Sequence, residues 1–504
     1  MSIISPAFKG LMKLRQSAID NFMYNPIDTQ LQVFHHLVGT AQFTEYGKKY
    51  SFDRINSIAD FQKQVPINDY DSLKPYIQRI LEGNQNILWP SPISWFAKSS
   101  GTTSDKSKFI PVSKESLDDT HYKAGKDVLA LYLNQFPQSY VTSGKCLIIG
   151  GSHQINQFNA ESFYGDLSAV MQQNMPLAGQ ILRTPDLAIS LMKEWEEKIE
   201  KIAHTTINEN VTYMAGVPTW TLVLIKRIFE IAGTNNLLDV WPNLELYIHG
   251  GVSFKPYRKQ FEEYIPTQFM HYLETYNASE GFFAAQDDVN IDGMLMLLNH
   301  GIFYEFMPME EYGKEHPRTL TLKEVEIGKN YALVISTNGG LWRYLVGDTI
   351  QFTTLHPYRI KVTGRLKHFI NAFGEEVIVD NTDQAIQEAS KFTGAIVNDY
   401  TAAPVYMTGK DNGAHEWIIE FENLPCPLDV FVTAMDKALQ AINSDYEAKR
   451  YKDMALRMPV VHIMPKGGFN LWLKNKGKLG GQHKVPRLSN ERNYLDEILP
   501  FTKQ

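Results

Sequence analysis

The sequence has little cysteine and no feature of an exported or membrane-inserted protein. Its two cysteines, Cys146 and Cys426, lie far apart and lack the spacing of a metal site. A disulfide framework is therefore not expected, and a reducing compartment fits. No apolar run is long enough to span a bilayer, and the first residues lack the apolar core of a signal peptide. We expect a cytoplasmic protein without a membrane partner.

Positive charge is not in excess either. The chain has 49 Lys and Arg residues against 56 Asp and Glu residues, which gives a net charge of -7. Neither half is strongly basic, so a nucleic acid partner is not expected. With 43% hydrophobic and 21% charged residues over 504 positions, the composition is typical of a globular protein with two or more domains.

The chain also lacks a Walker loop, because the required glycine spacing and the terminal Gly-Lys-Ser/Thr are missing. It has instead a hydroxyl-rich stretch from Ser99 to Lys108. Gly101 permits a tight turn, the hydroxyls and amides offer donors to an anion, and the two lysines add positive charge. The stretch is compatible with the triphosphate of a nucleotide, although taken alone an ordinary loop is the favoured interpretation.

The first part of the chain predicts alternating helices and strands. Amphipathic helices are expected over the first ninety residues, broken at Pro66 and Pro75. One continuous helix is expected from Thr184-Pro185 through Ile202. The predicted strands cover residues 93–97, 145–151, 244–248 and 269–273, and a further helix covers 255–265. This order indicates an α/β domain whose ligand binds at the carboxyl ends of strands.

The remainder of the chain changes character twice. Residues 295–362 predict short strands, including 331–335 and 341–344, in a mainly antiparallel sheet or barrel-like part. After Phe373 the chain predicts a compact α+β unit, with a helix over 382–392, strands over 395–397 and 417–421, a helix over 428–442 and a strand over 460–464. We place the boundary near Gly374-Glu375-Glu376. The expected fold class is α/β, with a large N-terminal domain over 1–375 and a small α+β domain over 376–504.

Two stretches in the middle of the chain are candidates for binding a nucleotide. The glycines of His249-Gly250-Gly251 leave a flat backbone surface where a purine can lie, and a plain strand-to-helix turn is an equal alternative. The stretch Tyr276 to Glu280 supplies an aromatic ring for stacking and a carboxylate for a magnesium ion. An ordinary loop is the favoured alternative for the second stretch.

Three later stretches are also candidates. Asp348 follows a glycine at the end of a predicted strand and could accept hydrogen bonds from both ribose hydroxyls, with a hairpin turn as the alternative. Residues 363–376, which include Arg365, suit a hinge or a plain linker. Near the C-terminus, Lys484 lies between a glycine-rich stretch and Val-Pro, where it could carry an ammonium group into a site; a solvated charged face is the alternative.

Taken in order, these stretches resemble the adenylate-forming superfamily of acyl and aryl ligases and luciferases. The closest resemblance is to the auxin-responsive Gretchen Hagen acyl acid amido synthetases and their bacterial relatives. It rests on Ser99 to Thr102, Tyr276 to Glu280, Arg343 to Asp348 and Gln482 to Arg487. One departure is Leu345, which stands where the plant motif has an arginine. An auxin or jasmonate substrate is not implied.

The resemblance implies an enzyme that uses ATP and Mg²⁺ to adenylate a carboxylic acid and then joins the acyl group to an amine, expected to be an amino acid. Glu280 would place the metal, and Lys484 would steady charge on the transferring groups. The nucleotide would be held by Ser99, Ser100, Gly101, Thr102, Thr103, Gly250, Gly251, Tyr276, Ser279, Asp348 and Arg365. An acyl-CoA ligase and a non-catalytic nucleotide-binding relative remain alternatives. The oligomeric state is not fixed by the sequence, and a monomer is compatible with it.

Overall fold

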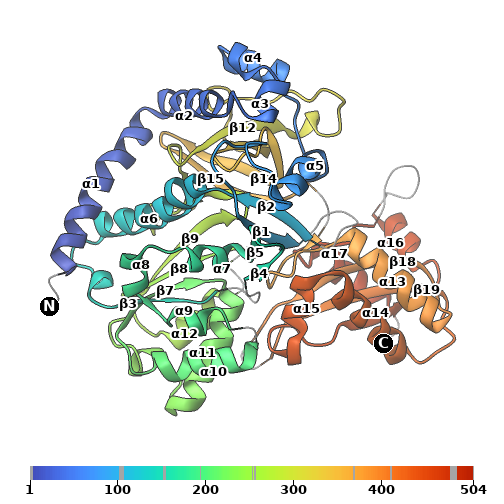
Figure 1. Cartoon of the computed structure of the whole chain (residues 1–504). Helices are drawn as coiled ribbons and strands as arrows, with labels where there is room; N and C mark the ends of the chain where they lie inside the picture. Colours follow the sequence, from blue (N-terminus) through green and yellow to red (C-terminus); the bar gives the residue numbers. More distant parts are fainter. Residues whose placement is uncertain are drawn as a thin grey trace.

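The computed structural model describes residues 4–100, 107–150, 155–192, 194–252, 254, 257–366, 369–408, 411–476 and 485–502. Figure 1 shows a large part that runs from the N-terminus to the yellow strands, and a smaller orange and red part beside it. The α/β class and the division into a large N-terminal and a small C-terminal domain are confirmed. Within the described residues, none of the helices has the length and apolar character needed to cross a membrane.

The large part is built on an eleven-stranded sheet in the order β12-β13-β14-β15-β11-β10-β9-β8-β7-β3-β6. One half of this sheet is parallel, and it contains the strands predicted over 145–151 and 244–248. Its strands are β3 (Lys145–Ile148), β6 (Arg183–Thr184), β7 (Val211–Gly216), β8 (Leu246–Gly250) and β9 (His271–Ala278). The carboxyl ends of β8 and β9 therefore meet at one edge, where the Gly-Gly turn and the Tyr276 stretch lie.

The other half of the sheet is antiparallel, as predicted for residues 295–362. Its strands continue the parallel half, and the hairpin of β9 and β10 joins the two. They are β10 (Gly281–Ala285), β11 (Met294–Met296), β12 (Ile302–Pro308), β13 (Asn330–Thr337), β14 (Tyr344–Leu355) and β15 (Tyr358–Arg365). The predicted strand over 341–344 is wrong, because Arg343 has a φ of 41° and β14 begins only at Tyr344.

A separate four-stranded sheet, in the order β2-β1-β5-β4, carries the hydroxyl-rich stretch. Its strands are β1 (Trp95–Ser100), β2 (Ser107–Val112), β4 (Asn156–Gln157) and β5 (Phe163–Gly165). The strand predicted over 93–97 is thus confirmed in type, but it begins and ends later. Because β1 and β2 pair antiparallel, Ser99 lies opposite Lys108 in the register.

Helices cover the sheets of the large part. The predicted N-terminal helices are confirmed as α1 (Ile4–Tyr24), α2 (Pro26–Ala41), α3 (Glu45–Lys49), α4 (Ile58–Gln64) and α5 (Tyr70–Leu81). The others are α6 (Tyr122–Gln135), α7 (Leu167–Gln173), α8 (Leu177–Ile181), α9 (Leu187–Ser190), α10 (Trp195–Thr206), α11 (Pro218–Ala232) and α12 (Arg258–Tyr264). A π-helical stretch, Ser116–His121, leads into α6.

Two helix predictions are wrong. Pro75 lies inside α5 instead of breaking it, because Asp69 caps the helix by accepting from the Ser72 amide and its apolar face is buried in the core. The continuous helix expected after Thr184 is two helices, α9 and α10. The side chain of Asp186 caps α9, while Thr184 belongs to β6. The apolar periodicity in the sequence continues from α9 into α10, although the helix ends at Ser190 and a new one begins at Trp195.

The small part contains the predicted helix–strand–strand–helix–strand order. The strands β18 (Ile396–Val405), β19 (Ala414–Asn423) and β20 (Val460–Met464) form a three-stranded sheet. Its helices are α13 (Val379–Thr393), α14 (Leu428–Ile442), α15 (Ser444–Arg450), α16 (Gly468–Asn475) and α17 (Asn493–Ile498). The predicted boundary falls between the short paired strands β16 (Phe369–Ile370) and β17 (Val377–Ile378).

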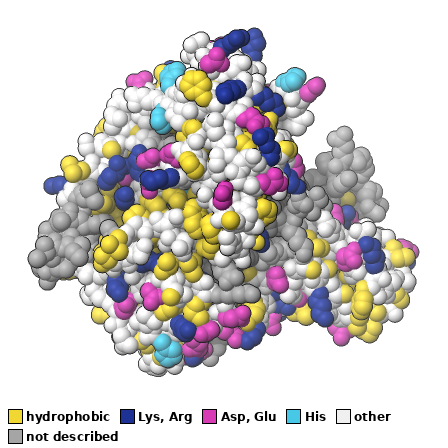
Figure 2. Space-filling view, in the orientation of Figure 1, with side chains coloured by type: hydrophobic (Ala, Val, Ile, Leu, Met, Phe, Trp, Pro, Cys, Tyr) yellow, Lys and Arg dark blue, Asp and Glu magenta, His cyan; other side chains and the backbone are white. Residues whose placement is uncertain are grey.

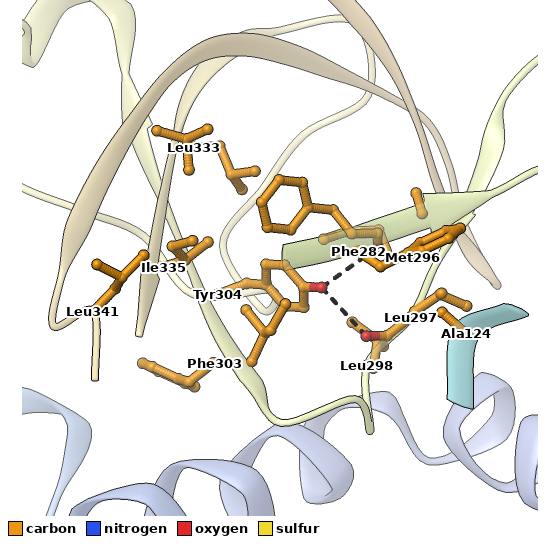
Figure 3. Close-up of a cluster of buried hydrophobic side chains, with 14 of the residues drawn as sticks. Ala124, Phe282, Met296, Leu297, Leu298, Phe303, Tyr304, Leu333, Ile335 and Leu341 are labelled. Atoms are coloured by element: carbon orange, nitrogen blue, oxygen red, sulfur yellow. Dashed lines mark hydrogen bonds between the residues drawn. The ribbon is translucent and has the colours of Figure 1, made fainter. Parts of the chain in front are cut away.

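The main core lies between the sheet and the N-terminal helices. Figure 3 shows Tyr304 of β12 among aliphatic and aromatic side chains, with its hydroxyl donating to the carbonyls of Phe283 and Leu297 at 3.4 and 3.3 Å. A buried phenol needs such partners, since an unpaired hydroxyl in an apolar core costs about 1–3 kcal/mol. Figure 2 shows Lys, Arg, Asp and Glu side chains mixed over the visible face, without a field of one sign.

A buried ion pair fixes the entry to β14. The Arg343 guanidinium bonds both oxygens of Glu305 in β12 at 3.0 Å, and it also donates to the carbonyls of Gln62 and Val65. Arg343 and Glu305 are 4% and 0% exposed. Every charge in this group has partners, so removal of one member leaves the other buried and unpaired.

We expect Arg343→Met to lower the free energy of unfolding by about 3–5 kcal/mol, because Glu305 would be left buried without its partner. Denaturant unfolding measures this change. Lys329→Ala is the matched control, since Lys329 pairs with Glu326 at the surface and exposed pairs contribute about 1 kcal/mol or less. Equal unfolding midpoints for the two variants would contradict the structural role of Arg343.

Candidate active site

Asp348 lies inside β14, where it pairs in register with Arg365 at the end of β15. The expectation that it ends a strand and the alternative of a hairpin turn are both wrong. The register between β13 and β14 shifts at this point, and Gly347 has a φ of 98°, which favours glycine. An irregularity of this kind re-aims the neighbouring side chain, and it places the Asp348 carboxylate among residues of three other segments.

Both carboxylate oxygens of Asp348 are bound. Arg365 donates from Nε to Oδ1 at 2.7 Å, and the Tyr276 hydroxyl donates to Oδ2 at 2.6 Å. Arg365 also donates to Glu376 at 3.1 Å. Burial opposes the charge of Arg365, but Glu376 and Asp348 outweigh it and raise the pKa of the guanidinium. Asp348 is therefore held by donors from two other strands, and each carboxylate oxygen has a second lone pair with which it can accept from a further donor.

The Tyr276 stretch is a hairpin and not a loop. Tyr276 belongs to β9, and only Ser279 and Glu280 connect β9 to β10, because Ala278 pairs with Gly281. The Tyr276 ring is buried against Phe283, with ring centroids 4.8 Å apart. Stacking of this ring on adenine stays a prediction, and the structure adds a second role, the bond to Asp348.

Glu280 lies half-buried beside other charged groups. Burial raises the pKa of its carboxyl, Lys108 opposes this rise, and Glu376 and Asp348 add to it. Lys108 is itself buried in β2, with its ammonium nitrogen 5.8 Å from the centre of the Tyr70 ring. Three carboxylates and two cations from segments far apart in sequence thus meet at this edge of the sheet.

The Gly-Gly turn closes the same edge. A Cβ on Gly250 would lie 2.5 Å from the carbonyl oxygen of Thr275, so close packing of β8 on β9 requires glycine there. Gly251 has a φ of 81°, and its carbonyl accepts from the side chain of Asn371 at 3.3 Å. Contact of these glycines with a purine stays a prediction. The preceding His249 is stacked on Phe254, and burial lowers its pKa to about 3, so it is neutral packing.

Several predicted residues fall where the structure gives little or nothing. Gly101, Thr102, Thr103 and Lys484 lie outside the described residues. The backbones of Ser99 and Ser100 end β1 opposite Lys108 and Ser107, so the hydroxyl-rich stretch joins β1 to β2. The pairing places the start of this stretch beside Lys108, and through Lys108 beside Glu280.

Sequence reasoning missed two residues of this group. From the sequence, Glu376 is expected only as part of a hinge, but its carboxylate accepts a hydrogen bond from Arg365. Tyr344 is fully buried, and within the described part of the chain its hydroxyl has no hydrogen-bond partner. Glu280 lies close enough to Tyr344 to raise its pKa further, after burial. No local pattern marks either residue, because both act through contacts across the fold.

The carboxylates at this edge can supply part of the ligand set of a nucleotide-bound metal. Over the described ranges, no three His, Cys, Asp or Glu side chains are grouped as a metal site. Mg²⁺ that arrives with a nucleotide needs only one or two carboxylates, since phosphates and water complete its shell. Glu280 is the half-buried carboxylate at this edge that is bound to neither Arg365 nor Tyr276, so it suits that role.

We expect Asp348→Asn to weaken ATP binding about 10–100-fold, because it removes a charged hydrogen-bond acceptor. Isothermal titration with ATP measures the change. Asp287→Asn is the matched control. Asp287 pairs at 2.7 Å with Arg359, which belongs to β15, the strand that ends at Arg365. The proposed contact predicts loss for Asp348→Asn alone, and equal ATP affinity in both variants would contradict it.

Three models of one protein family match the chain in order. Models of the GH3 family N-terminal, central and C-terminal domains match residues 15–270, 295–365 and 380–493. An indole-3-acetic acid-amido synthetase, GH3.3 of Arabidopsis thaliana, is 23% identical over 96% of this chain and 92% of its own. The jasmonoyl–L-amino acid synthetase JAR4 of Nicotiana attenuata is 24% identical over 89% of each chain.

Two solved structures share the fold. GH3.15 acyl acid amido synthetase in complex with 2,4-DB superposes with a TM-score of 0.64 at 17% identity, covering 98% of this chain and 96% of its own. A 2-hydroxyisobutyryl-CoA ligase gives 0.56 at 13% identity, covering 98% and 92%. The family models together span most of the chain in the expected order. The chain is therefore a member of the GH3 family, with the fold of adenylate-forming ligases.

Proposed function

We propose that this protein is an ATP-dependent acyl acid amido synthetase. In the first step the carboxylate of an acid attacks the α-phosphate of ATP, which forms an acyl-adenylate and releases pyrophosphate. In the second step an amino acid amine attacks the acyl carbonyl, which forms an amide and releases AMP. The observation that carries the proposal is the joined group of Asp348, Arg365, Tyr276 and Glu280 in a chain whose curated relatives are amido synthetases.

The adenosine half of ATP is assigned to the fixed carboxylate and its surroundings. Asp348 would accept from the ribose hydroxyls, and Arg365 and Tyr276 hold it in place for this contact. A carboxylate that is already oriented loses little entropy when the ribose binds. The backbone at Gly250 and Gly251 would lie along the adenine, and Ser279 would border it from the β9–β10 connection.

The phosphate half is assigned to the positive and hydroxyl-bearing groups. Ser99, Ser100, Gly101, Thr102 and Thr103 would cradle the phosphates by amides and hydroxyls. Lys108 supplies a buried positive charge at the base of this stretch. Mg²⁺, when bound with ATP through Glu280, would neutralise phosphate charge, and Lys484 would steady charge on the transferring oxygens.

The two-step scheme assigns residues 1–375 and 376–504 to two domains that change partners between the steps. Arg365 and Glu376 lie on opposite sides of that boundary and bind each other. The connecting residues are also tied to the large domain, where Tyr257 donates to the Ala372 carbonyl at 2.5 Å. Charged and polar contacts of this kind can exchange partners, as a turning segment requires.

The first test is carboxylate-dependent exchange of labelled pyrophosphate into ATP with Mg²⁺. The panel should contain indole-3-acetate, jasmonate, substituted benzoates, fatty acids and amino acids. We expect exchange with at least one acid, followed by amide formation when amino acids are added to that reaction. Formation of a thioester with CoA, in place of an amide, would overturn the proposal that an amino acid is the acyl acceptor. Bound ATP without exchange for any acid would favour a non-catalytic relative.

We expect Lys484→Ala to lower the exchange rate about 10²–10³-fold, the usual cost of losing one charged donor from such a site. ATP affinity should change little, since the lysine is assigned to charge that develops during transfer. Lys476→Ala is the control, because Lys476 lies nearby in sequence and pairs with Glu497 at the surface. Full exchange activity in Lys484→Ala would remove the assigned role.

The pH dependence of exchange tests Glu280. Burial raises the pKa of this carboxyl, so on acidification it takes up its proton at a higher pH than an ordinary Glu and loses its charge. We expect kcat/KM for ATP, which reports the enzyme before the metal and nucleotide bind, to fall on the acid side through that raised pKa, and Glu280→Gln to be slow with this limb absent. Glu326→Gln, at an exposed site, should keep the wild-type profile. An unchanged limb in Glu280→Gln would exclude Glu280 as its source.

A further inference from the structure

The small domain meets the large domain at the start of α11. Trp220 lies in the first turn of this helix, shortly after the end of β7, and it is 2% exposed. The neighbouring Thr219 donates to the Phe373 carbonyl at 3.3 Å. The first turn of α11 thus contacts the segment that leads into the small domain. Figure 1 shows α15 on the side of the small part that faces the large part.

Lys449 of α15 lies on the ring of Trp220. Its ammonium nitrogen is 4.4 Å from the ring centre, and the residue is 7% exposed. A Cβ on Gly374 would lie 3.3 Å from Cε of the lysine, so the lysine stem also packs beside the boundary turn. The side chain is therefore enclosed by the large domain on one side and by the turn on the other.

Carboxylates of three segments act on the charge of Lys449. Burial lowers the pKa of its ammonium group, and the three carboxylates oppose that fall. Asp445 belongs to the same helix, Asp166 precedes α7 in the large domain, and Glu375 belongs to the boundary turn. One buried cation thus interacts with both domains and with the segment that joins them.

The boundary turn is attached to the small domain. Glu375 is fully buried, and its carboxylate accepts from the amides of Ala372 and Phe373 at 3.2 and 2.6 Å. The same carboxylate lies 2.8 Å from Nε2 of His415 in β19. The turn and α15 are therefore parts of one body, and the ring of Trp220 is a surface of the other body on which Lys449 lies.

A second contact between the domains is weaker. Lys452 pairs with Glu196 of α10, but their side chains are 55% and 47% exposed. An exposed pair of this kind changes an equilibrium constant about 5-fold or less. A cation that is held over a tryptophan ring away from water contributes about 30-fold. Of these two contacts, the one at Lys449 therefore has the larger effect on how the domains pack.

We propose that Lys449 and Trp220, here called the domain lock, hold the two domains in this arrangement, and that the lock opens between the two half-reactions. The inference rests on the proposed function, in which the domains change partners between the steps. Because the two residues belong to different domains, a turn of the small domain carries the lysine off the ring. The lock sets the populations of the two arrangements, and both residues are positioning residues without an assigned contact to substrate.

Labelling with an amine-reactive reagent, read by mass spectrometry, tests the lock without any acid. In the wild type we expect Lys449 to react at least about 10-fold more slowly than the exposed Lys452. In Trp220→Ala the labelling of Lys449 should rise about 10-fold or more, while that of Lys452 stays unchanged. Equal labelling of Lys449 in the two proteins would overturn the lock.

Small-angle scattering separates opening of the domains from a local gap beside the lysine. We expect a larger radius of gyration for Trp220→Ala than for the wild type. Increased labelling of Lys449 with an unchanged radius of gyration would contradict a role in holding the domains. Trp220→Phe provides a milder variant, with smaller changes in the same direction, if Trp220→Ala folds poorly.

The two half-reactions should respond unequally to Lys449→Ala. Pyrophosphate exchange with the best acid of the panel reports adenylation, and transfer from chemically prepared acyl-adenylate to the amino acid reports amide formation. We expect the ratio of the two rates to shift about 10–30-fold, because one arrangement gains population at the expense of the other. Lys449→Arg should recover most of the wild-type ratio, since a guanidinium also lies favourably over an aromatic ring.

The matched control is Lys452→Ala. It removes the exposed pair with Glu196, which also joins the two domains, and leaves the domain lock in place. We expect the ratio of the half-reactions to stay within about 2-fold of wild type. A shift as large as that of Lys449→Ala would show that any contact between the domains has this effect, and it would overturn the special role of the lock.

The remaining outcomes separate this inference from the proposed function. An equal change of both half-reactions in Lys449→Ala, or no change in either, would overturn the lock and leave the proposed function intact. Absence of exchange in the wild type with every acid would overturn the proposed function and the assignment of the lock to its two steps. Labelling and scattering would then still decide whether Lys449 and Trp220 hold the domains together.

Discussion

The ion pair between Asp348 and Arg365 is the contact on which the rest of the site depends. It joins β14 to the end of β15, and through Arg365 it reaches Glu376 beyond the predicted boundary. Tyr276 adds β9 to the same carboxylate. Burial alone would disfavour these charges, so each is stable only because its partners come from other segments. The site is therefore assembled by one network that also determines how the segments meet.

The two ends of the motif from Arg343 to Asp348 lie in different surroundings. Arg343 is buried against Glu305 and the end of α4, and it anchors the chain where β14 begins. Asp348 lies at the edge of the sheet within the charged group. A motif can thus contain residues of unlike purpose.

Much of the element order followed from the sequence, because apolar periodicity is a local property. The strand at 460–464 and the helix at 428–442 were predicted at their exact bounds, and the parallel strand beginning at Lys145 was also identified. Predictions were wrong where tertiary packing determined the local structure. Pro75 is an example, because it lies inside a helix whose apolar face is buried. The helix expected after Thr184 failed because periodicity does not record a turn of the chain.

The sequence by itself determined the α/β class, the order of the motifs and the family, since these depend on residue types along the chain. It also identified Asp348, Glu280 and Tyr276 as candidates, but only the tertiary structure decided how they are connected. The pairing of Asp348 with Arg365 needs a strand register, and the approach of Lys108 to Glu280 needs two sheets to meet. Such contacts join residues distant in sequence, and no local pattern encodes a distance across the fold.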